Sequence, residues 1–229
     1  MMKWNTMMAI KQLLILISIL LLHSPIFSQH VTHKARLGAE LNFKAGQFFV
    51  IGSEFEQRLT PGFRLHDRFL IEPSIQFKPI KLLALGVKYR HYWYSNEQNN
   101  FLYAQQFFVY LRVLKSFNNW SVYGQVMYQN TMEINDYQFA FIPGYFTLRP
   151  KIRSKYHIFG TRYSLNASSE LFYEYKGLQF NKIRMRSEIA ASYKINKVSE
   201  VNAGIMYQTD TKNPKDKIFI WNVKYEFNL

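Results

Sequence analysis

The sequence has 229 residues, a net charge of +14, no cysteine and 48% hydrophobic residues, and aromatic residues alone make up 17%. This length suits a single domain. The absence of cysteine excludes disulfide scaffolds, cysteine-ligated zinc, iron–sulfur clusters, thiol catalysis and lipid attachment through an N-terminal cysteine.

Residues 1–28 have the features of a secretory signal peptide. Lys3 and Lys11 precede an apolar run at residues 13–22, and small or helix-breaking residues follow it up to Ser28. The run is shorter than the roughly 20 residues that a membrane-spanning helix needs, so a retained anchor is the weaker interpretation. We therefore predict cleavage after Ser28 and a mature domain at residues 29–229.

The mature chain alternates apolar and polar residues along almost its whole length, which is the period of β-strands with one apolar face. The last segment is the clearest example, because Trp221, Val223, Tyr225, Phe227 and Leu229 share one face and polar residues occupy the other. The chain contains eleven candidate strands in all. In chain order they lie at residues 37–43, 49–55, 69–77, 83–89, 101–113, 120–128, 148–158, 171–175, 183–195, 201–207 and 219–229.

Short and long connections alternate between these strands. The short ones lie near residues 44–47, 78–81, 116–119, 159–164 and 196–199, and the long ones near 60–68, 95–100, 133–147, 175–179 and 209–217. Short turns at one rim and long loops at the other are typical of outer-membrane barrels, whose strand number in bacterial single chains is even. The sequence therefore predicts an all-β fold, a single antiparallel transmembrane β-barrel of about 10–12 strands, with ten or twelve favoured by parity.

The connection at residues 133–147 is unusually apolar for a loop, because it contains Phe139, Phe141, Ile142 and Tyr145. An exposed apolar segment normally packs against something. We predict that this loop folds back over the mouth of the barrel or into the lumen, or contacts a protein partner.

Alternation alone does not say which face points outward, since a soluble barrel would hide the apolar face inside. Aromatic residues near strand ends and a last strand with aromatic residues at alternate positions favour the membrane. That last strand also resembles the signal that the outer-membrane assembly machinery recognises. The predicted partners are therefore outer-membrane lipid and this machinery, through Trp221, Val223, Tyr225, Phe227 and Leu229.

A row of cations marks the polar faces of two predicted strands. Its members are Arg149, Lys151, Arg153 and Lys155 on one strand and Lys182, Arg184 and Arg186 on another, with Glu170 and Glu174 on the strand between them. If this face is the lumen, ion pairs between neighbouring strands would fill a small barrel. The alternative is a narrow channel that attracts small anions. The cations alternate with apolar residues and form no solvated patch, so we predict no nucleic-acid partner.

No catalytic or metal-binding constellation stands out, and we predict a non-enzymatic protein without metal or cofactor. His30 and His33 precede the first predicted strand and fit a solvated terminus. A hydrolase at the outer rim would have to use His66, Asp67, Asp136 and Asp210, which are isolated residues of different loops. This alternative stays a distant third.

Three stretches of the chain are similar to a known family: residues 101–133 (FLYAQQFFVYLRVLKSFNNWSVYGQVMYQNTME), 165–175 (LNASSELFYEY) and 180–208 (FNKIRMRSEIAASYKINKVSEVNAGIMYQ), followed by the final strand WNVKYEFNL. In these stretches the chain resembles a bacterial domain-of-unknown-function family, number twenty-four-ninety, whose members are described as outer-membrane β-barrels. The resemblance implies a barrel fold and an outer-membrane location in a Gram-negative bacterium. The family has no assigned activity, so no site residue is implied.

Overall fold

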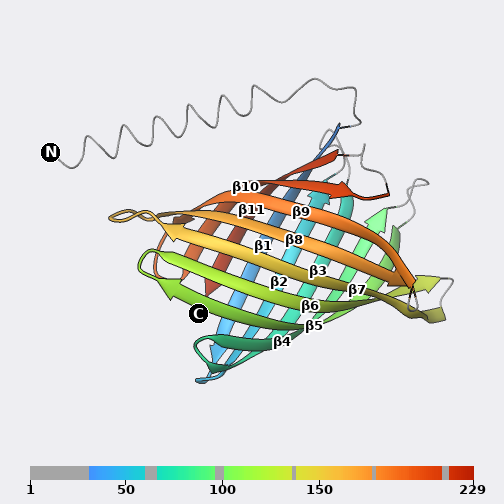
Figure 1. The fold of residues 1–229 in the computed structure, drawn as a ribbon, viewed down its shortest axis with the longest axis horizontal. Coiled ribbons are helices and arrows are strands. Elements are labelled where there is room, and N and C mark those ends of the chain that lie inside the picture. The colour runs from blue at the N-terminus through green and yellow to red at the C-terminus, as the bar shows by residue number, and fades with distance from the viewer. Residues whose placement is uncertain (1–30, 60–65, 96–100, 136–137, 177–178, 213–216) are drawn as a thin grey trace. The chain divides into compact units, whose positions relative to one another are not determined.

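The computed structural model describes residues 31–59, 66–95, 101–135, 138–176, 179–212 and 217–229. These residues form a single closed barrel of eleven strands (Figure 1). The strands are β1 (Val31–Ala45), β2 (Phe49–Leu59), β3 (His66–Ile80), β4 (Leu83–Ser95), β5 (Phe101–Phe117), β6 (Trp120–Asn135), β7 (Gln138–His157), β8 (Tyr163–Lys176), β9 (Gln179–Lys194), β10 (Ser199–Asp210) and β11 (Lys217–Asn228). The predicted all-β barrel is confirmed.

Each strand pairs with its neighbours in the chain, and tight turns connect several of them. The two-residue turn between β5 and β6 has Asn118 at φ 49°, a left-handed conformation that asparagine tolerates well. Phe117 and Trp120 pair directly across it.

No helix long and apolar enough to cross a membrane occurs among the described residues.

The barrel closes through a parallel pair of strands, β1 and β11. Their register runs from Val31 beside Lys217 to Asn42 beside Asn228, whereas every other pair of strands is antiparallel. Consecutive strands of an up-and-down barrel alternate in direction, so the first and the eleventh must run the same way. The expectation of an even strand number is therefore wrong, and all eleven candidate strands belong to the sheet.

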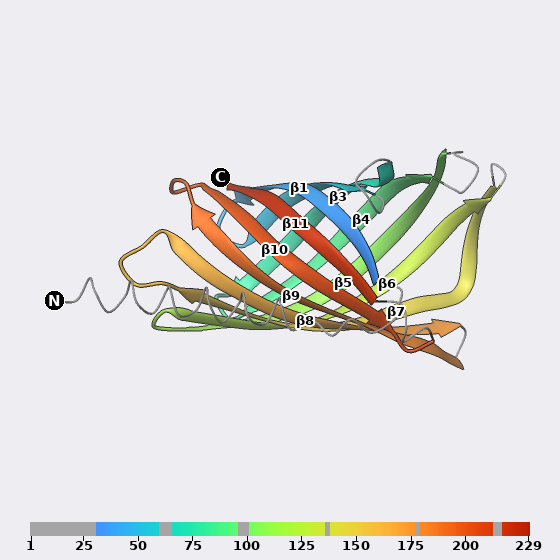
Figure 2. The ribbon, with the colours of Figure 1, turned by 90° about the horizontal axis from the view of Figure 1, so that it is seen from above.

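The two ends of the barrel differ. At the turn end lie the connections 46–48, 81–82, 118–119, 158–162 and 195–198 together with the end of β11, and at the loop end lie the start of β1 and the ends of β2, β4, β6, β8 and β10 (Figure 2). Two predicted long loops are wrong, because residues 133–147 and 175–179 belong almost entirely to the hairpins β6–β7 and β8–β9. The apolar residues of 133–147 extend the strand pairing, with Phe139 beside Ile134, and the side chains of residues 132–145 lie outside the described part.

The apolar faces of the strands point outward and the charged faces point inward. Along β11, Trp221 and Val223 are 47% and 45% exposed, whereas Asn222 between them is buried. The same pattern recurs around the barrel, with Phe43 56% exposed and Glu72 only 2%. This distribution is the reverse of that in a water-soluble barrel, where the apolar face fills the interior.

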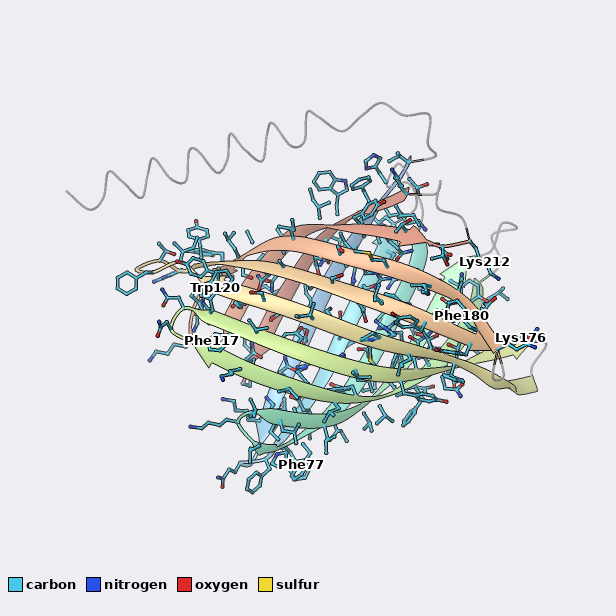
Figure 3. The ribbon with its side chains drawn as sticks, viewed as in Figure 1. Phe77, Phe117, Trp120, Lys176, Phe180 and Lys212 are labelled. Carbon is cyan, nitrogen blue, oxygen red and sulfur yellow. The ribbon has the colours of Figure 1, made fainter. Side chains whose placement is uncertain are left out.

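Aromatic side chains gather at both ends of the outer face. Phe77, Phe117 and Trp120 lie at the turn end and Phe180 at the loop end, beside Lys176 and Lys212 at the same rim (Figure 3). Ring pairs join adjacent strands there, with Trp120 packed on Tyr156 at 4.8 Å between centroids. Aromatic girdles at two levels are typical of barrels that span a bilayer.

Candidate functional site in the barrel lumen

The polar faces of the strands enclose a cavity of about 410 Å³ inside the barrel. Charged side chains dominate its walls. Among the described residues they are twelve cations (Arg36, Arg58, Arg68, Lys88, Arg90, Arg112, Arg149, Lys151, Arg153, Arg184, Arg186 and Lys224) and six glutamates (Glu40, Glu54, Glu72, Glu170, Glu188 and Glu226). The lumen therefore carries an excess of positive charge.

On the wall formed by β1 to β4, each buried acid is shared by two cations. Glu72 accepts hydrogen bonds from Lys88 Nζ at 2.6 Å and from Arg90 Nε at 2.7 Å. Glu56 accepts from Arg58 Nε at 2.5 Å and also pairs with Arg36. Such buried carboxylates are compatible with folding only because their charges and lone pairs are satisfied.

An ion-pair cluster also crosses the parallel closure of the barrel. Lys224 on β11 pairs with Glu40 on β1 and, at 3.3 Å, with Glu54 on β2. The strands that close the barrel are therefore connected by side chains in the lumen as well as by the backbone ladder.

The predicted basic row lies on the opposite wall, and most of its members have carboxylate partners. Arg149 donates from Nε to Glu170 at 2.9 Å, and Arg184 donates from Nη2 to Glu174 at 2.6 Å. Lys182 lies 3.1 Å from Asp210 and 3.7 Å from Glu174. Toward the turn end, Lys155 Nζ lies 2.6 Å from Glu200.

The remaining members of the row have no carboxylate within ion-pair distance among the described residues. Arg153 donates to Asn166 Oδ1 at 3.2 Å, and Arg186 donates from Nη2 to Gln208 Oε1 at 2.9 Å. Lys151 lines the cavity. The structure thus places the row in the lumen and divides it into cations held by acids and cations that face amides or the cavity.

Aromatic rings inside the lumen hold several of the guanidinium groups, a feature that sequence reasoning missed. Phe172 is 4% exposed, and the guanidinium carbons of Arg149, Arg184 and Arg186 lie 4.4, 4.8 and 4.8 Å from its ring centroid. Phe108 is fully buried and lies 4.9 Å from the guanidinium of Arg90. The sequence does contain a signal for these rings, because Phe172 and Phe108 each occupy a polar-face position in an otherwise alternating strand.

The residues of the predicted C-terminal assembly strand lie along β11. Trp221, Val223 and Tyr225 point outward and are exposed, and Phe227 is half-buried. Leu229 follows the strand, and its backbone nitrogen donates to the Asn42 carbonyl at 2.8 Å. This strand is paired on both sides, with β10 and with β1.

The residues considered for hydrolysis or metal binding do not assemble in the described part. Asp210 is engaged by Lys182, whereas Asp136 and the side chains of His66 and Asp67 lie outside the described residues. His33 is not in a solvated terminus but in β1, where it stacks on Phe219 at 5.8 Å; His30 lies outside. The described residues contain no group of three His, Asp or Glu that could hold a metal ion.

A family model described as Protein of unknown function (DUF2490) matches residues 36–218. The match starts in β1 and ends in β11, so it includes most of the barrel wall. No curated protein matches the chain.

Proposed function

Because the chain belongs to the family of proteins of unknown function DUF2490, we propose its role from the geometry of the barrel: a non-enzymatic, integral protein of the bacterial outer membrane. The observation that carries this proposal is the inverted distribution of side chains, apolar outside and charged inside. A continuous apolar outer surface is unfavourable in water and matches the hydrocarbon of a bilayer. The aromatic residues at both ends support the same placement.

In this proposal the charged lumen is mainly structural. Carboxylates such as Glu72 and Glu170 bind cations from neighbouring strands, and Lys224 connects the strands that close the barrel. The ion pairs fill much of a narrow interior and fix the register of the wall.

The route to the membrane is part of the proposal. The signal peptide at residues 1–28 would direct export, and β11 would present Trp221, Tyr225 and Phe227 to the barrel assembly machinery. Outer-membrane lipid would then surround the apolar face.

Heat-modifiability together with cell fractionation tests the membrane placement. A folded barrel extracted in mild detergent should migrate faster on an unheated gel than after boiling. The protein should also sediment with outer membranes. Recovery as a soluble periplasmic protein would contradict the proposal.

Assembly through β11 needs its own test, because deleting residues 221–229 would also open the barrel. We therefore pair the deletion with a variant in which Trp221, Tyr225 and Phe227 are replaced by alanine, which keeps the backbone pairing with β1 and β10. Both variants should fail to accumulate in the outer membrane. If the alanine variant inserts normally, these side chains are not the assembly signal.

The second candidate function is a narrow passage that prefers anions, favoured by the twelve cations against six glutamates around the cavity. Planar bilayers should then show stepwise conductance with anion selectivity. Replacing Lys151 and Arg153 with glutamine should weaken the selectivity without breaking an ion pair. Silent bilayers containing protein shown to be folded would contradict this candidate.

A further inference from the structure

Three cations gather around one tyrosine on the wall formed by β5, β6 and β7. The guanidinium carbons of Arg112 and Arg153 lie 5.0 and 5.8 Å from the ring centroid of Tyr123, and Arg153 Nη1 donates to the Tyr123 hydroxyl at 3.4 Å. Lys151 lies two residues before Arg153 on the same strand and lines the same cavity. We call Arg112, Tyr123, Lys151 and Arg153 the Tyr123 cluster.

The cations of this cluster differ from most others in the lumen, because none of them takes part in an ion pair among the described residues. Arg112 donates from Nε and Nη2 to the amide oxygen of Gln125 at 3.0 and 2.8 Å, and Arg153 donates to that of Asn166. These acceptors satisfy hydrogen bonds but do not neutralise charge.

The acids closest to the cluster accept hydrogen bonds from other residues. Glu170 is the register partner of Lys151, yet it accepts two hydrogen-bonding contacts from Arg149, at 2.9 and 2.7 Å. Glu188 accepts from Asn222 at 2.7 Å, and Glu226 accepts from Asn202 at 2.9 Å. The three cations therefore lie side by side at the wall of a cavity, with no carboxylate within ion-pair distance among the described residues.

Unbalanced charges in a narrow lumen are unfavourable unless a counter-ion joins them. Arginine forks bind the oxygens of phosphate in pairs, lysine adds a point charge, and the tyrosine hydroxyl adds a donor. A doubly charged oxyanion compensates more of this positive charge than a singly charged carboxylate does. We propose that the Tyr123 cluster binds a doubly charged tetrahedral oxyanion, either inorganic phosphate or the phosphate group of a monoester.

This inference goes beyond the proposed function, because it concerns the lumen alone and does not depend on the bilayer. A barrel found outside the outer membrane could still bind phosphate at this cluster. Conversely, a heat-modifiable outer-membrane barrel could lack the site. A negative result in the phosphate titration is therefore distinguishable from a negative result in the fractionation test.

The test uses the full mature chain folded in detergent and titrated with inorganic phosphate, with chloride added to hold the ionic strength constant. Calorimetry should give saturable binding at one site, and the thermal unfolding midpoint should rise with phosphate. Lys151→Gln and Arg153→Gln should each weaken binding about tenfold or more. Lys115→Gln is the matched control, because this exposed lysine lies on β5 with Arg112 but at the turn end.

Folding is checked in the same variants without phosphate. Lys151→Gln removes one of three like charges and no side-chain hydrogen bond among the described residues, so it should leave the unfolding midpoint unchanged or raise it, and its loss of binding cannot be attributed to a misfolded barrel. Glycerol 3-phosphate tests the source of the phosphate: binding equal to that of inorganic phosphate supports a monoester ligand, and weaker binding supports free phosphate. The proposal is overturned if phosphate has no more effect than chloride, or if Lys115→Gln weakens binding as much as Lys151→Gln.

Discussion

The guanidinium carbon of Arg149 lies 4.4 Å from the ring centroid of Phe172, a buried phenylalanine on the lumen side of β8. Arg184 and Arg186 approach the same ring from the neighbouring strand, each at 4.8 Å. An apolar ring is thus placed among three like charges. The ring face is the negative part of its quadrupole, so it attracts the cations and keeps them apart from one another.

Replacing Phe172 with leucine should therefore destabilise the barrel although apolar volume is largely kept. Three cation–ring contacts are lost, which predicts a decrease of about 1–3 kcal/mol in the free energy of unfolding. Urea unfolding followed by tryptophan fluorescence in detergent would measure it. The control is Phe180→Leu, since Phe180 is 53% exposed on the outer face and should change stability much less. Equal effects of the two substitutions would contradict the role of the ring.

Glu72→Gln should be among the most damaging single changes in the lumen. The substitution leaves Lys88 and Arg90 without their shared carboxylate at a position that is only 2% exposed. Removing one partner of a buried ion pair costs about 3–5 kcal/mol. Glu200→Gln removes the one ion-pair partner that Lys155 has among the described residues, near the turn end, and should cost about 1 kcal/mol or less. Unfolding curves for the two variants that coincide would show that the shared carboxylate has no special importance.

Gly86 permits a close approach of the Tyr110 ring to the backbone of β4. A Cβ atom at this position would overlap the ring of Tyr110, its partner on β5, so Gly86→Ala should displace the ring and cost about 1–3 kcal/mol. A Cβ at Gly124 would meet nothing within 4 Å, and Gly124→Ala should be neutral or slightly stabilising. The fraction that resists unfolding on an unheated gel would compare the two variants. The interpretation fails if Gly86→Ala is as stable as Gly124→Ala.

Cysteine labelling would determine which end of the barrel faces outward, and the native chain has no cysteine to interfere. Short turns of outer-membrane barrels face the periplasm. A cysteine at Lys212, at the loop end, should react with an impermeant maleimide on intact cells. A cysteine at Asn118, at the turn end, should react only after the outer membrane is opened. The reverse order of labelling would invert the orientation.

The sequence was sufficient to predict the eleven strands, because a strict alternation of apolar and polar residues such as that from Trp221 to Leu229 is typical of a β-strand and not of a helix. The same alternation is symmetric between the two faces, so the inward direction of the charges needed separate arguments from aromatic positions. The expectation of an even strand number was wrong, since nothing in the sequence of β1 or β11 indicates that they pair in parallel.

The contacts in the lumen were less accessible to prediction. Lys155 on β7 pairs with Glu200 on β10, which is 45 residues away in the sequence. These two strands are not neighbours in the sheet. Such a partnership depends on the width of the interior and on the shear of the whole barrel. The apolar residues 133–147 were mistaken for a loop because the alternation is irregular there, where the pairing shifts between Asn130 and Met132.

The parallel closure also restricts how this chain can be rearranged. Val31 and the end of β11 lie at opposite ends of the barrel, so a linker joining these two points would have to run the full length of the wall. It could pass only through the charged lumen or along the apolar outer face. Even-stranded barrels can be circularly permuted with a short linker at one rim. A short linker therefore cannot permute this eleven-stranded barrel. Closure of the barrel requires β1 and β11 to pair in the same direction, and in this register Lys224 forms its ion pair with Glu40.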